Sequence, residues 1–366
     1  MTSIFQSWQS VGNVRTDFGF GALRKRSASF DDLELLLICS AGALKRREIG
    51  GLVAELSRSN RLTIEGSITP NPSKDQLDEI LARLGGKRFD LICAVGGGSV
   101  IDAAKVISVG LSGDEIRTSD LLGDAQNKKL VKTRLIAVPT TAGTGAEITP
   151  FATIWDDVEK KKLSYATPLI VPEEAILDPE LTLTVPHATR LDCALDSLSH
   201  SLESLWNKNA NSASRTFSLR AIDLMLETIP AIVDREEDEQ VYESQLLASH
   251  FAGLAISSSR TAIAHAISYP LTARFSVPHG LACSFTLGAI LRRSQDQLGQ
   301  DLGPRRLAQL NQTFTATNCA PRILEYVSRL EVLSLIDEMF TPERADNFIH
   351  PLDVEDVRDI LKESLM

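Results

Sequence analysis

The chain has 366 residues, of which 43% are hydrophobic and 23% are charged, and its formal net charge is −10 at neutral pH. A chain of this length has room for two domains, each with a sizeable core. The acidic balance argues against a nucleic-acid-binding surface and against binding to anionic membranes, so an anionic ligand would need local positive groups.

The cysteines and the N-terminal segment indicate the cellular compartment in which we expect the protein. Five cysteines are scattered without a C-x-x-C pair: Cys39, Cys93, Cys193, Cys283 and Cys319. This pattern is typical of buried thiols in a reducing compartment rather than of disulfides or a zinc ribbon. The segment MTSIFQSWQSVGNVRTDFGF lacks the apolar core of a signal peptide, and no run approaches the length of about eighteen apolar residues that a membrane span needs. We therefore expect a cytoplasmic protein.

Strand and helix patterns alternate along the first half of the chain. Short apolar runs predict buried strands, and amphipathic stretches predict helices. In chain order we expect a strand at 35–39, a helix at 44–58, a strand at 61–66, a helix at 74–84, a strand at 90–95, a helix at 100–111 and a strand at 135–138. This alternation predicts a parallel sheet with helices on both faces.

From Pro186 onward, helical patterns dominate, for example at 212–226, 242–256 and 354–365. The sequence therefore predicts an α/β domain at residues 1–185 and an all-helical domain at residues 186–366. The acidic stretch 234–240 is expected to be solvated surface.

Two glycine-containing loops follow predicted strands. The segment GGGSVIDAAK (96–105) carries three consecutive glycines, and a helix opens at Ser99; PTTAGTGAE (139–147) follows the strand at 135–138. Glycine lets the backbone approach a phosphate closely, and the first N–H groups of a helix carry the positive end of its dipole. Two such loops at the carboxyl edge of a parallel sheet predict a pyrophosphate-binding crevice. The spacing is not G-x-G-x-x-G, and tight turns also use glycine for steric reasons alone.

One aspartate and three of the six histidines form a second pattern. Asp196 and His200 lie four apart in LDCALDSLSHSLESLW, so on a helix both side chains leave the same face. His265 and His279 follow in AHAISYPLTARFSVPHG. A carboxylate with three imidazoles suits a divalent transition metal such as iron or zinc rather than calcium. Taken alone, an Asp–His pair at this spacing is more often a surface pair.

These segments together resemble the iron-containing (group III) alcohol dehydrogenases over nearly the whole chain. The landmarks, in order, are TPNPSKDQL (69–77), GGGSVIDAAK, PTTAGTGAE, AILDPELT (175–182), the Asp196/His200 pair and HAISYPLTARFSVPHG (265–280). The resemblance implies a two-domain, NAD(P)-dependent enzyme that interconverts an alcohol and an aldehyde at a metal, Fe(II) or alternatively zinc. The implied metal ligands are Asp196, His200, His265 and His279. The dinucleotide would lie on the sheet side of a cleft and the metal on the helical side, in a homo-oligomer that is a dimer or larger.

The resemblance also implies which residues contact the cofactor. The residues that would hold the pyrophosphate or line the cofactor are Gly97, Gly98, Ser99, Thr140, Thr141 and Thr144, with Asn71, Asp102 and Lys162 at further cofactor positions. Asn71 is equally compatible with a simple turn residue before Pro72. The neighbours of Lys162 in KKK (160–162) are also compatible with a solvated charge run.

One position bears on the choice of dinucleotide. Family members that prefer NAD carry an acidic residue after the first strand, where it bonds the ribose hydroxyls. Here Ser40 stands at about this position, so a 2′-phosphate is not repelled, and Lys45, Arg46 or Arg47 could pair with it. NADP(H) is therefore favoured, with NAD(H) as the alternative.

Two residues depart from the family pattern. Tyr269 stands where many members carry a histidine that is thought to relay a proton. A tyrosine with its ordinary pKa near ~10 is a poor base at neutral pH. A purely structural role for Tyr269 in the pocket wall is therefore an equal alternative. Arg260 lies shortly before His265, where members that act on neutral alcohols have small or apolar residues. An arginine in a dry pocket needs a compensating anion, which predicts a substrate with an anionic head group. Pairing with a protein carboxylate is the alternative, and Arg274 is a weaker second candidate.

The substrate subgroup follows from segments around these residues. Arg260, SYPLT (268–272) and FATIWDDVEKKKLSY (151–165) are similar to the phosphonoacetaldehyde reductases of phosphonate biosynthesis. This implies reduction of phosphonoacetaldehyde to 2-hydroxyethylphosphonate. The alternatives are a general short-chain alcohol, lactaldehyde or semialdehyde dehydrogenase of the same family and, more remotely, a dehydroquinate-synthase-like lyase. The remaining histidines, His187, His250 and His350, are not expected to bind the metal.

Overall fold

The computed structural model describes residues 9–10, 14–111, 116–122, 130–159, 161–340 and 345–366. The chain divides into two compact units, Met1–Thr141 with Ala146–Thr184, and Ala142–Gly145 with Val185–Met366. The expected first domain contained the whole 139–147 loop, whereas residues 142–145 belong to the helical unit. Most of the N-terminal segment considered above (1–8 and 11–13) and Lys160 lie outside the described residues.

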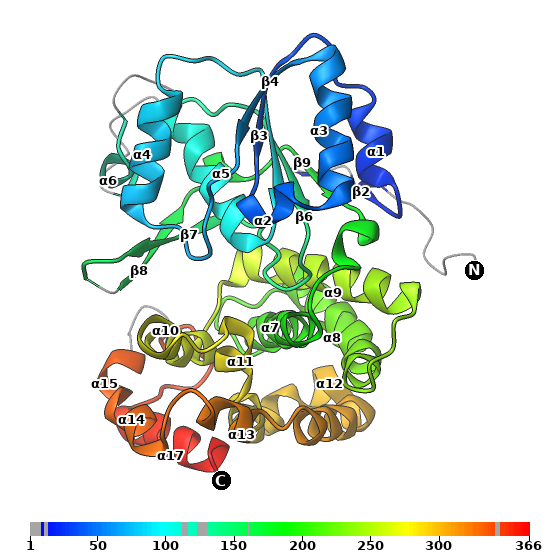
Figure 1. The fold of residues 1–366 in the computed structure, drawn as a ribbon. Helices are drawn as coiled ribbons and strands as arrows, with labels where there is room; N and C mark the ends of the chain where they lie inside the picture. Colours follow the sequence, from blue (N-terminus) through cyan, green and yellow to red (C-terminus); the bar gives the residue numbers. More distant parts are fainter. Residues whose placement is uncertain (1–8, 11–13, 112–115, 123–129, 160, 341–344) are drawn as a thin grey trace. The chain divides into compact units, whose positions relative to one another are not determined.

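The first unit is built on a seven-stranded sheet in the order β1-β2-β9-β6-β5-β3-β4 (Figure 1). All neighbouring strands are parallel except β1 and β2. The strands are β1 Gln9–Ser10, β2 Arg15–Phe18, β3 Glu34–Ile38, β4 Arg61–Glu65, β5 Leu91–Gly96, β6 Leu135–Pro139 and β9 Glu174–Leu177, and a separate antiparallel hairpin consists of β7 Phe151–Asp156 and β8 Lys161–Ala166. The short β2 and β9 and the hairpin were not among the expected strands.

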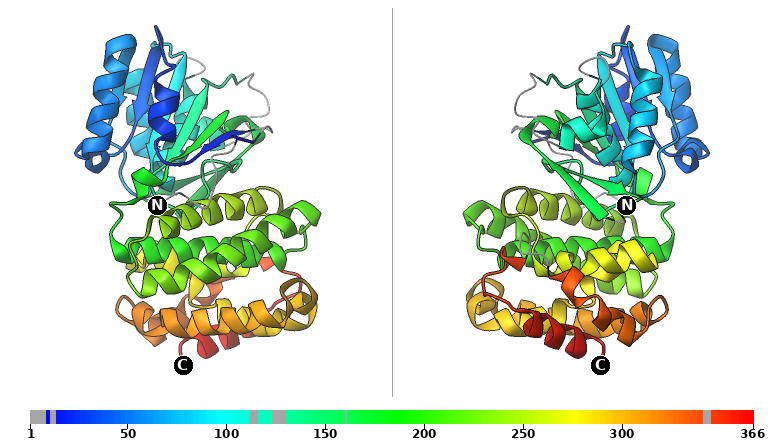
Figure 2. Two further views of the ribbon diagram at one scale, coloured as in Figure 1. Left: turned by 90° about the vertical axis from the view of Figure 1, so that its right-hand side faces the viewer. Right: turned by 90° about the vertical axis from the view of Figure 1, so that its left-hand side faces the viewer.

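Helices cover both faces of this sheet (Figures 1 and 2). They are α1 Ala22–Ser27, α2 Ala41–Leu44, α3 Arg47–Ser59, α4 Lys74–Leu84, α5 Gly98–Gly110 and α6 Thr118–Leu122. Successive side chains of a strand point to opposite faces. Leu36 and Ile92 therefore pack with α4 and α5, whereas Leu35 and Cys93 pack with α1 and α3. The expected parallel sheet between two helical layers is confirmed.

The strand order creates a switch point beside β3. The chain passes from β3 to β4 on one side and then returns to add β5 on the other side of β3. The two crossover helices, α3 and α4, consequently lie on opposite faces. Open α/β sheets bind ligands outside the carboxyl ends of the strands at such a reversal. Here the loops at that place begin after Ile38 and after Gly96.

Lys105, the last residue of GGGSVIDAAK, has a structural role. Its side chain is fully buried, and Nζ donates to the carbonyl oxygens of Thr149 at 2.8 Å and Phe151 at 2.7 Å and to Thr149 Oγ1 at 3.1 Å. Burial lowers the pKa of Lys105 to about 8. Because three acceptors surround the ammonium group, this lysine ties α5 to the start of β7 and needs no ligand to satisfy it.

The second unit is helical, as expected. Its helices are α7 His187–Leu205, α8 Ser212–Val233, α9 Glu239–Ser259, α10 Ile263–Phe275, α11 His279–Ser284, α12 Leu287–Thr317, α13 Cys319–Leu324, α14 Arg329–Ser334, α15 Ile336–Met339 and α17 Val354–Ser364. Helix α7 is central and contacts α8, α9, α10, α11 and α12. Its buried hydroxyls at Ser199 and Ser201 donate to the carbonyls of Leu195 and Ser197, so a serine-rich helix can be buried. Within the described part of the chain, no helix combines the length and apolar character needed to cross a bilayer.

Candidate functional site

The four metal ligands predicted from the sequence meet in the second unit, on three helices: Asp196 and His200 on α7, His265 on α10 and His279 on α11. We call these four residues the metal centre. Asp196 Oδ1 lies 3.8 Å from Nε2 of His200, 3.6 Å from Nε2 of His265 and 4.0 Å from Nε2 of His279. The rings of His200 and His265 stack with centroids 4.6 Å apart, and His279 meets His265 edge-on at 5.3 Å.

These separations fit donors that share one ion. Nitrogen and oxygen ligands bind zinc at about 2.0–2.2 Å, which sets neighbouring donors of a tetrahedral site about 3.4 Å apart. The observed 3.6–4.0 Å is close to this value and is too long for hydrogen bonds. Asp196 Oδ1 and His265 Nε2 are buried and have no hydrogen-bond partner. Buried polar atoms without partners are costly, so the metal centre fits a divalent transition metal.

Two of the four residues, Asp196 and His200, have shifted pKa values that favour the protonation states needed to bind a metal. Burial by itself would raise the pKa of Asp196, but the neighbouring His200, His265 and His279 outweigh it, and the pKa lies well below its ordinary value. Burial lowers the pKa of His200 to about 4. An ionised carboxylate and a neutral imidazole are the forms that coordinate metals.

Glu203 contacts the metal centre and was not predicted. It lies one turn after His200 on α7, is fully buried, and has Oε2 2.5 Å from Nδ1 of His265. Its other oxygen accepts from the backbone N–H groups of Ala264 at 2.6 Å and His265 at 3.2 Å. The carboxylate thus holds the first turn of α10 and fixes the ring so that Nε2 faces Asp196. The only signal in the sequence is the one-turn spacing from His200.

We expect Glu203→Gln to lower the affinity for a divalent metal about 10–100-fold, because the amide cannot hold the His265 ring as firmly as a carboxylate does. Chelator-competition titration measures this affinity. Asp192→Asn is the matched control: Asp192 is a largely buried carboxylate on α7 that pairs with Arg322, and its loss should leave the affinity nearly unchanged. Parental affinity in Glu203→Gln would show that this carboxylate only caps α10.

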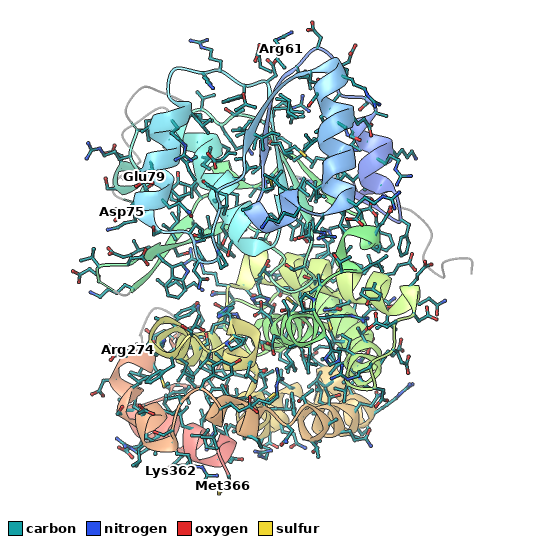
Figure 3. All side chains as sticks on the ribbon, in the orientation of Figure 1. Arg61, Asp75, Glu79, Arg274, Lys362 and Met366 are labelled. Carbon is teal, nitrogen blue, oxygen red and sulfur yellow. The ribbon has the colours of Figure 1, made fainter. Side chains whose placement is uncertain are left out.

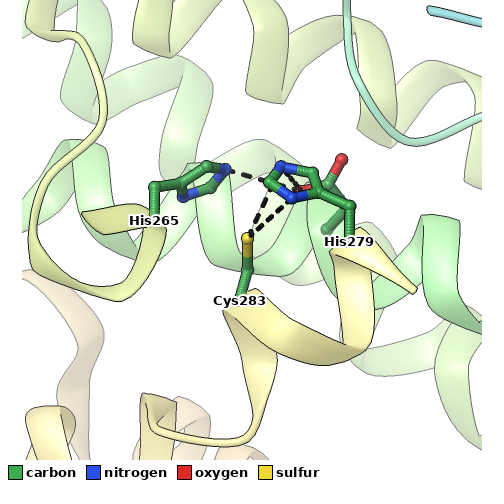
Figure 4. Close-up of side chains that lie close together, drawn as sticks. His265, His279 and Cys283 are labelled. Carbon is green, nitrogen blue, oxygen red and sulfur yellow. Dashed lines mark hydrogen bonds and ion pairs between the residues drawn. The ribbon is translucent and has the colours of Figure 1, made fainter. Parts of the chain in front are cut away.

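A thiol also lies beside the metal centre (Figure 4). Sγ of the fully buried Cys283 is 3.6 Å from Nε2 and 3.8 Å from Nδ1 of His279. The candidate donor atoms of Asp196, His265, His279 and Cys283 all lie within 4.8 Å of one another. The sequence predicted a buried thiol here but not its place.

The loop 142–145 packs against the helices of the second unit. The Ala142 carbonyl accepts from Nε2 of Gln245 at 3.3 Å, and the Gly143 carbonyl accepts from the Ser197 hydroxyl at 3.1 Å. A Cβ on Gly143 would lie 2.9 Å from Cys193 Cα, and Gly145, with φ +59°, approaches Gly253 still more closely. These glycines therefore have a steric role, which explains why residues 142–145, including Thr144, lie with the helical unit.

Several candidate cofactor residues gather after β5 and β6 in the first unit. The Asn71 N–H donates to the Ser99 hydroxyl at 3.1 Å, and a Cβ on Gly97 would lie 3.0 Å from Oγ1 of Thr141. Asn71 has φ 55°, the left-handed conformation that asparagine tolerates, so Asn71 serves as a turn residue whether or not it also contacts a cofactor. Gly97 precedes α5 without a side-chain cap, and Thr140 follows β6 with its N–H bonded to the Gly96 carbonyl at 3.0 Å.

Asp102 and Lys162 lie near each other beside this group. Oδ2 of Asp102, on α5, accepts from the Thr153 N–H of β7 at 2.8 Å. Burial raises the pKa of Asp102, and the charges of Lys105 and of Lys162 on β8 oppose the shift. The hairpin thus brings Lys162 toward α5, although the two are far apart in the sequence.

Ser40 begins α2 at the switch point. Its hydroxyl accepts from the Ala43 N–H at 3.2 Å, so it is an N-cap whether or not it contacts a ribose. Arg46 donates to the Leu181 carbonyl at 2.7 Å, which engages part of its guanidinium within the protein.

Tyr269 and Arg260 have different surroundings. The Tyr269 ring is nearly parallel to that of His279, with centroids 6.3 Å apart. Arg260 ends α9 with φ 66° and ψ 179°, a backbone conformation that is nearly restricted to glycine. Its side chain is exposed, so the expectation of a buried arginine is wrong. No described carboxylate pairs with it, whereas Arg274 pairs with Glu338 at 2.8 Å on the outside of the unit (Figure 3).

The other histidines lie outside the group of four residues that form the metal centre. Nε2 of His187 is 2.7 Å from the Ile232 carbonyl, and His350 packs edge-on against Phe348. His250 is buried in α9.

Two family profiles match the chain. The profile of the iron-containing alcohol dehydrogenases matches residues 13–179, and the C-terminal profile of the Fe-containing alcohol dehydrogenase family matches residues 190–344. The chain belongs to the iron-containing alcohol dehydrogenase family. The resemblance seen in the sequence is thereby confirmed.

The names of individual relatives of this chain give different substrates. A phosphonoacetaldehyde reductase of Streptomyces viridochromogenes is 36% identical over 233 residues, which are 62% of this chain and 58% of the relative. A 4-hydroxybutyrate dehydrogenase of Clostridium kluyveri is 34% identical over 214 residues, 58% of this chain and 56% of the relative. The chain thus spans less than two thirds of the length of either. A crystal structure of an iron-containing alcohol dehydrogenase from Thermotoga maritima has a TM-score of 0.82 at 25% identity and covers 98% of this chain and 99% of its own.

Proposed function

We propose that this protein is a metal-dependent, NAD(P)H-linked reductase that converts a short aldehyde to its primary alcohol. The observation that carries the proposal is the convergence of one carboxylate and three imidazoles, with Asp196 Oδ1 and His265 Nε2 buried and unpartnered. A divalent metal at this centre, when bound, supplies Lewis-acid polarisation of a carbonyl oxygen. The family favours Fe(II), while such a donor set has a higher intrinsic affinity for zinc.

The first unit supports the dinucleotide part of the proposal. The amides that open α5 follow Gly97, which offers no side-chain cap, and they lie at the sheet's switch point. Uncapped N–H groups at the positive end of a helix suit a pyrophosphate. We assign Gly97, Gly98 and Ser99 to the pyrophosphate. The further cofactor positions are Asn71, Asp102, Thr140, Thr141, Thr144 and Lys162.

An anionic head group on the substrate is the finer part of the proposal. Arg260 is exposed, lacks a carboxylate partner among the described residues and holds a strained backbone shortly before α10, which carries His265. Strain of this kind costs about 1–3 kcal/mol and clusters at ligand-binding sites. The substrates named for the two relatives, phosphonoacetaldehyde and 4-hydroxybutyrate, both carry an anionic group. Phosphonoacetaldehyde, reduced to 2-hydroxyethylphosphonate, is our first candidate.

Tyr269 serves this reaction as a wall of the metal centre. Its ring lies nearly parallel to that of His279, and a phenol with the ordinary tyrosine pKa near ~10 is a poor general base at neutral pH. We propose that water or a ribose hydroxyl delivers the proton.

The free cysteines and the family bear on the cellular setting. All five cysteines are free, which suits a reducing cytoplasm, and the family habit is a homo-oligomer. We therefore propose a cytoplasmic homo-oligomer, most simply a dimer, whose partners are small molecules.

The decisive experiment is to incubate protein loaded with Fe(II) or Zn(II) with NADPH and a panel of aldehydes while following nicotinamide absorbance. We expect metal-dependent oxidation of NADPH, fastest with aldehydes that carry a phosphonate or carboxylate. A dehydroquinate-synthase-like lyase would show no net oxidation. If no aldehyde oxidises NADPH with either metal, the proposal fails.

Cofactor preference gives a separate prediction at Ser40. The parent should favour NADPH, and Ser40→Asp should shift the ratio of kcat/KM toward NADH about ten-fold, or ~1.4 kcal/mol, by repelling the 2′-phosphate. Ser40→Asn is the matched control, because Asp and Asn are both good N-caps and differ in charge. Equal use of both cofactors by the parent and by Ser40→Asp would mean that this position does not contact the ribose.

A further inference from the structure

The turn between α9 and α10 holds Arg260 in a strained backbone conformation, with φ 66° and ψ 179°. Arg260 lies five residues before His265 of the metal centre. A residue other than glycine keeps such a conformation only where its surroundings over-determine it. The contacts of the two peptide groups that flank Arg260 therefore decide how its side chain is presented.

Both of these peptide groups are fixed by hydrogen bonds. The Arg260 N–H donates to the Ile256 carbonyl of α9 at 2.8 Å, and the Arg260 carbonyl accepts from Nδ2 of Asn207 at 3.2 Å. Asn207 is buried just after the end of α7, and its Oδ1 accepts from the Asn209 N–H at 2.9 Å, which orients the amide. The backbone of Arg260 consequently cannot relax without breaking one of these bonds.

A second asparagine holds the next peptide group. Nδ2 of Asn347 donates to the Thr261 carbonyl at 2.9 Å. Asn207 pairs with Phe348 in an antiparallel bridge, and the Lys208 N–H donates to the Asn347 carbonyl at 2.8 Å. The bridge thus brings the two asparagines together, and their amides reach successive carbonyls of the turn. We call Asn207 and Asn347 the amide clamp.

The Ser259 hydroxyl is a weaker candidate for the same role. It lies 3.1 Å from the Arg260 carbonyl, but also 3.1 Å from the Ala255 carbonyl and 2.9 Å from the Ser204 hydroxyl. A hydroxyl has one proton to donate, so these contacts compete. The amide clamp therefore holds the turn more firmly than Ser259 does.

We propose that Asn207 and Asn347 are positioning residues that keep Arg260 in its strained conformation and thereby direct its guanidinium toward the anionic head group of the substrate. A guanidinium binds a phosphonate or carboxylate through two parallel bonds only in a defined orientation. The inference rests on the proposed preference for anionic aldehydes and names the residues on which that preference depends.

Substrate preference tests this role. Asn207→Leu and Asn347→Leu remove the donors with little change in side-chain volume. Each should lower the ratio of kcat/KM for phosphonoacetaldehyde to kcat/KM for propanal about ten-fold, the lower end of the effect of removing the guanidinium. Asn60→Leu is the matched control, because Nδ2 of Asn60 also donates to a backbone carbonyl, that of Phe30 at 3.0 Å, but in the first unit. It should lower the unfolding temperature and leave the ratio unchanged.

A double-mutant cycle shows whether the amide clamp acts through Arg260. In the Arg260→Ala background, Asn207→Leu should leave the ratio unchanged, because the guanidinium is already absent. A parental ratio in both asparagine variants, or an equal fall with and without Arg260, overturns the clamp and leaves the proposed head group standing. A parent that shows no preference for anionic aldehydes overturns both.

Thermal unfolding gives a measurement that does not depend on the substrate. Arg260→Gly should raise the unfolding temperature of the parent by relieving the strain. In the Asn347→Leu background, where the turn can relax, the same change should raise it about half as much or less. Asn347 is half-buried, so this background should fold even where Asn207→Leu does not. An equal rise in both backgrounds overturns the proposal.

Discussion

Replacing His265 by alanine is expected to remove the bound metal and nearly all turnover. The change deletes the Nε2 donor that faces Asp196 at 3.6 Å and leaves the buried Glu203 carboxylate without its imidazole partner. Breaking a buried ionic pair by removing one member costs about 3–5 kcal/mol, so the variant should also unfold at a lower temperature. Elemental analysis of bound metal, kcat and thermal unfolding measure the three effects.

Two further variants make this result interpretable. Asp196→Asn nearly keeps the size of the side chain but loses the charge that the three histidines surround, so it should lose metal even where His265→Ala folds poorly. His187→Ala is the control: His187 lies on α7, the helix that carries Asp196, but outside the metal centre. This variant should retain metal and turnover. Stoichiometric metal with normal activity in His265→Ala would mean that the metal centre is assigned wrongly.

Replacing Arg260 by alanine is expected to change the preference for substrate charge. A charge-assisted bond to an anionic head group contributes ~1.5–3 kcal/mol, so kcat/KM for anionic aldehydes should fall about 10- to 150-fold. A neutral aldehyde such as propanal should be nearly unaffected. Steady-state kinetics with phosphonoacetaldehyde, succinic semialdehyde and propanal measure the difference.

The strained backbone at Arg260 provides the control. Arg260→Gly removes the same guanidinium but accepts φ 66° and ψ 179°, so it should lose the preference for anions while raising the unfolding temperature. Arg274→Ala removes an arginine already paired with Glu338 and should leave the preference unchanged. If the parent prefers propanal or lactaldehyde to every anionic aldehyde, a general short-chain alcohol dehydrogenase is the better description.

Local sequence patterns were sufficient for most of the regular structure. The helix expected at 74–84 is Lys74–Leu84, since Ser73 caps it and its leucines and isoleucine return at helical spacing to one face. Continuous apolar runs such as LLLIC (35–39) predicted strands buried on both sides, and β3, at Glu34–Ile38, has cores on both faces. The shared face of Asp196 and His200 follows from helical periodicity alone.

Tertiary structure alone decided which distant residues complete the site. Glu203 meets His265, 62 residues later, only because α10 packs against α7. Cys283 reaches the metal centre because Gly280 lets α11 approach the backbone of α7, and residues 142–145 join the helical unit because Gly145 fits against Gly253. Such contacts depend on how helices pack, and packing between distant segments leaves no periodic signal in the sequence.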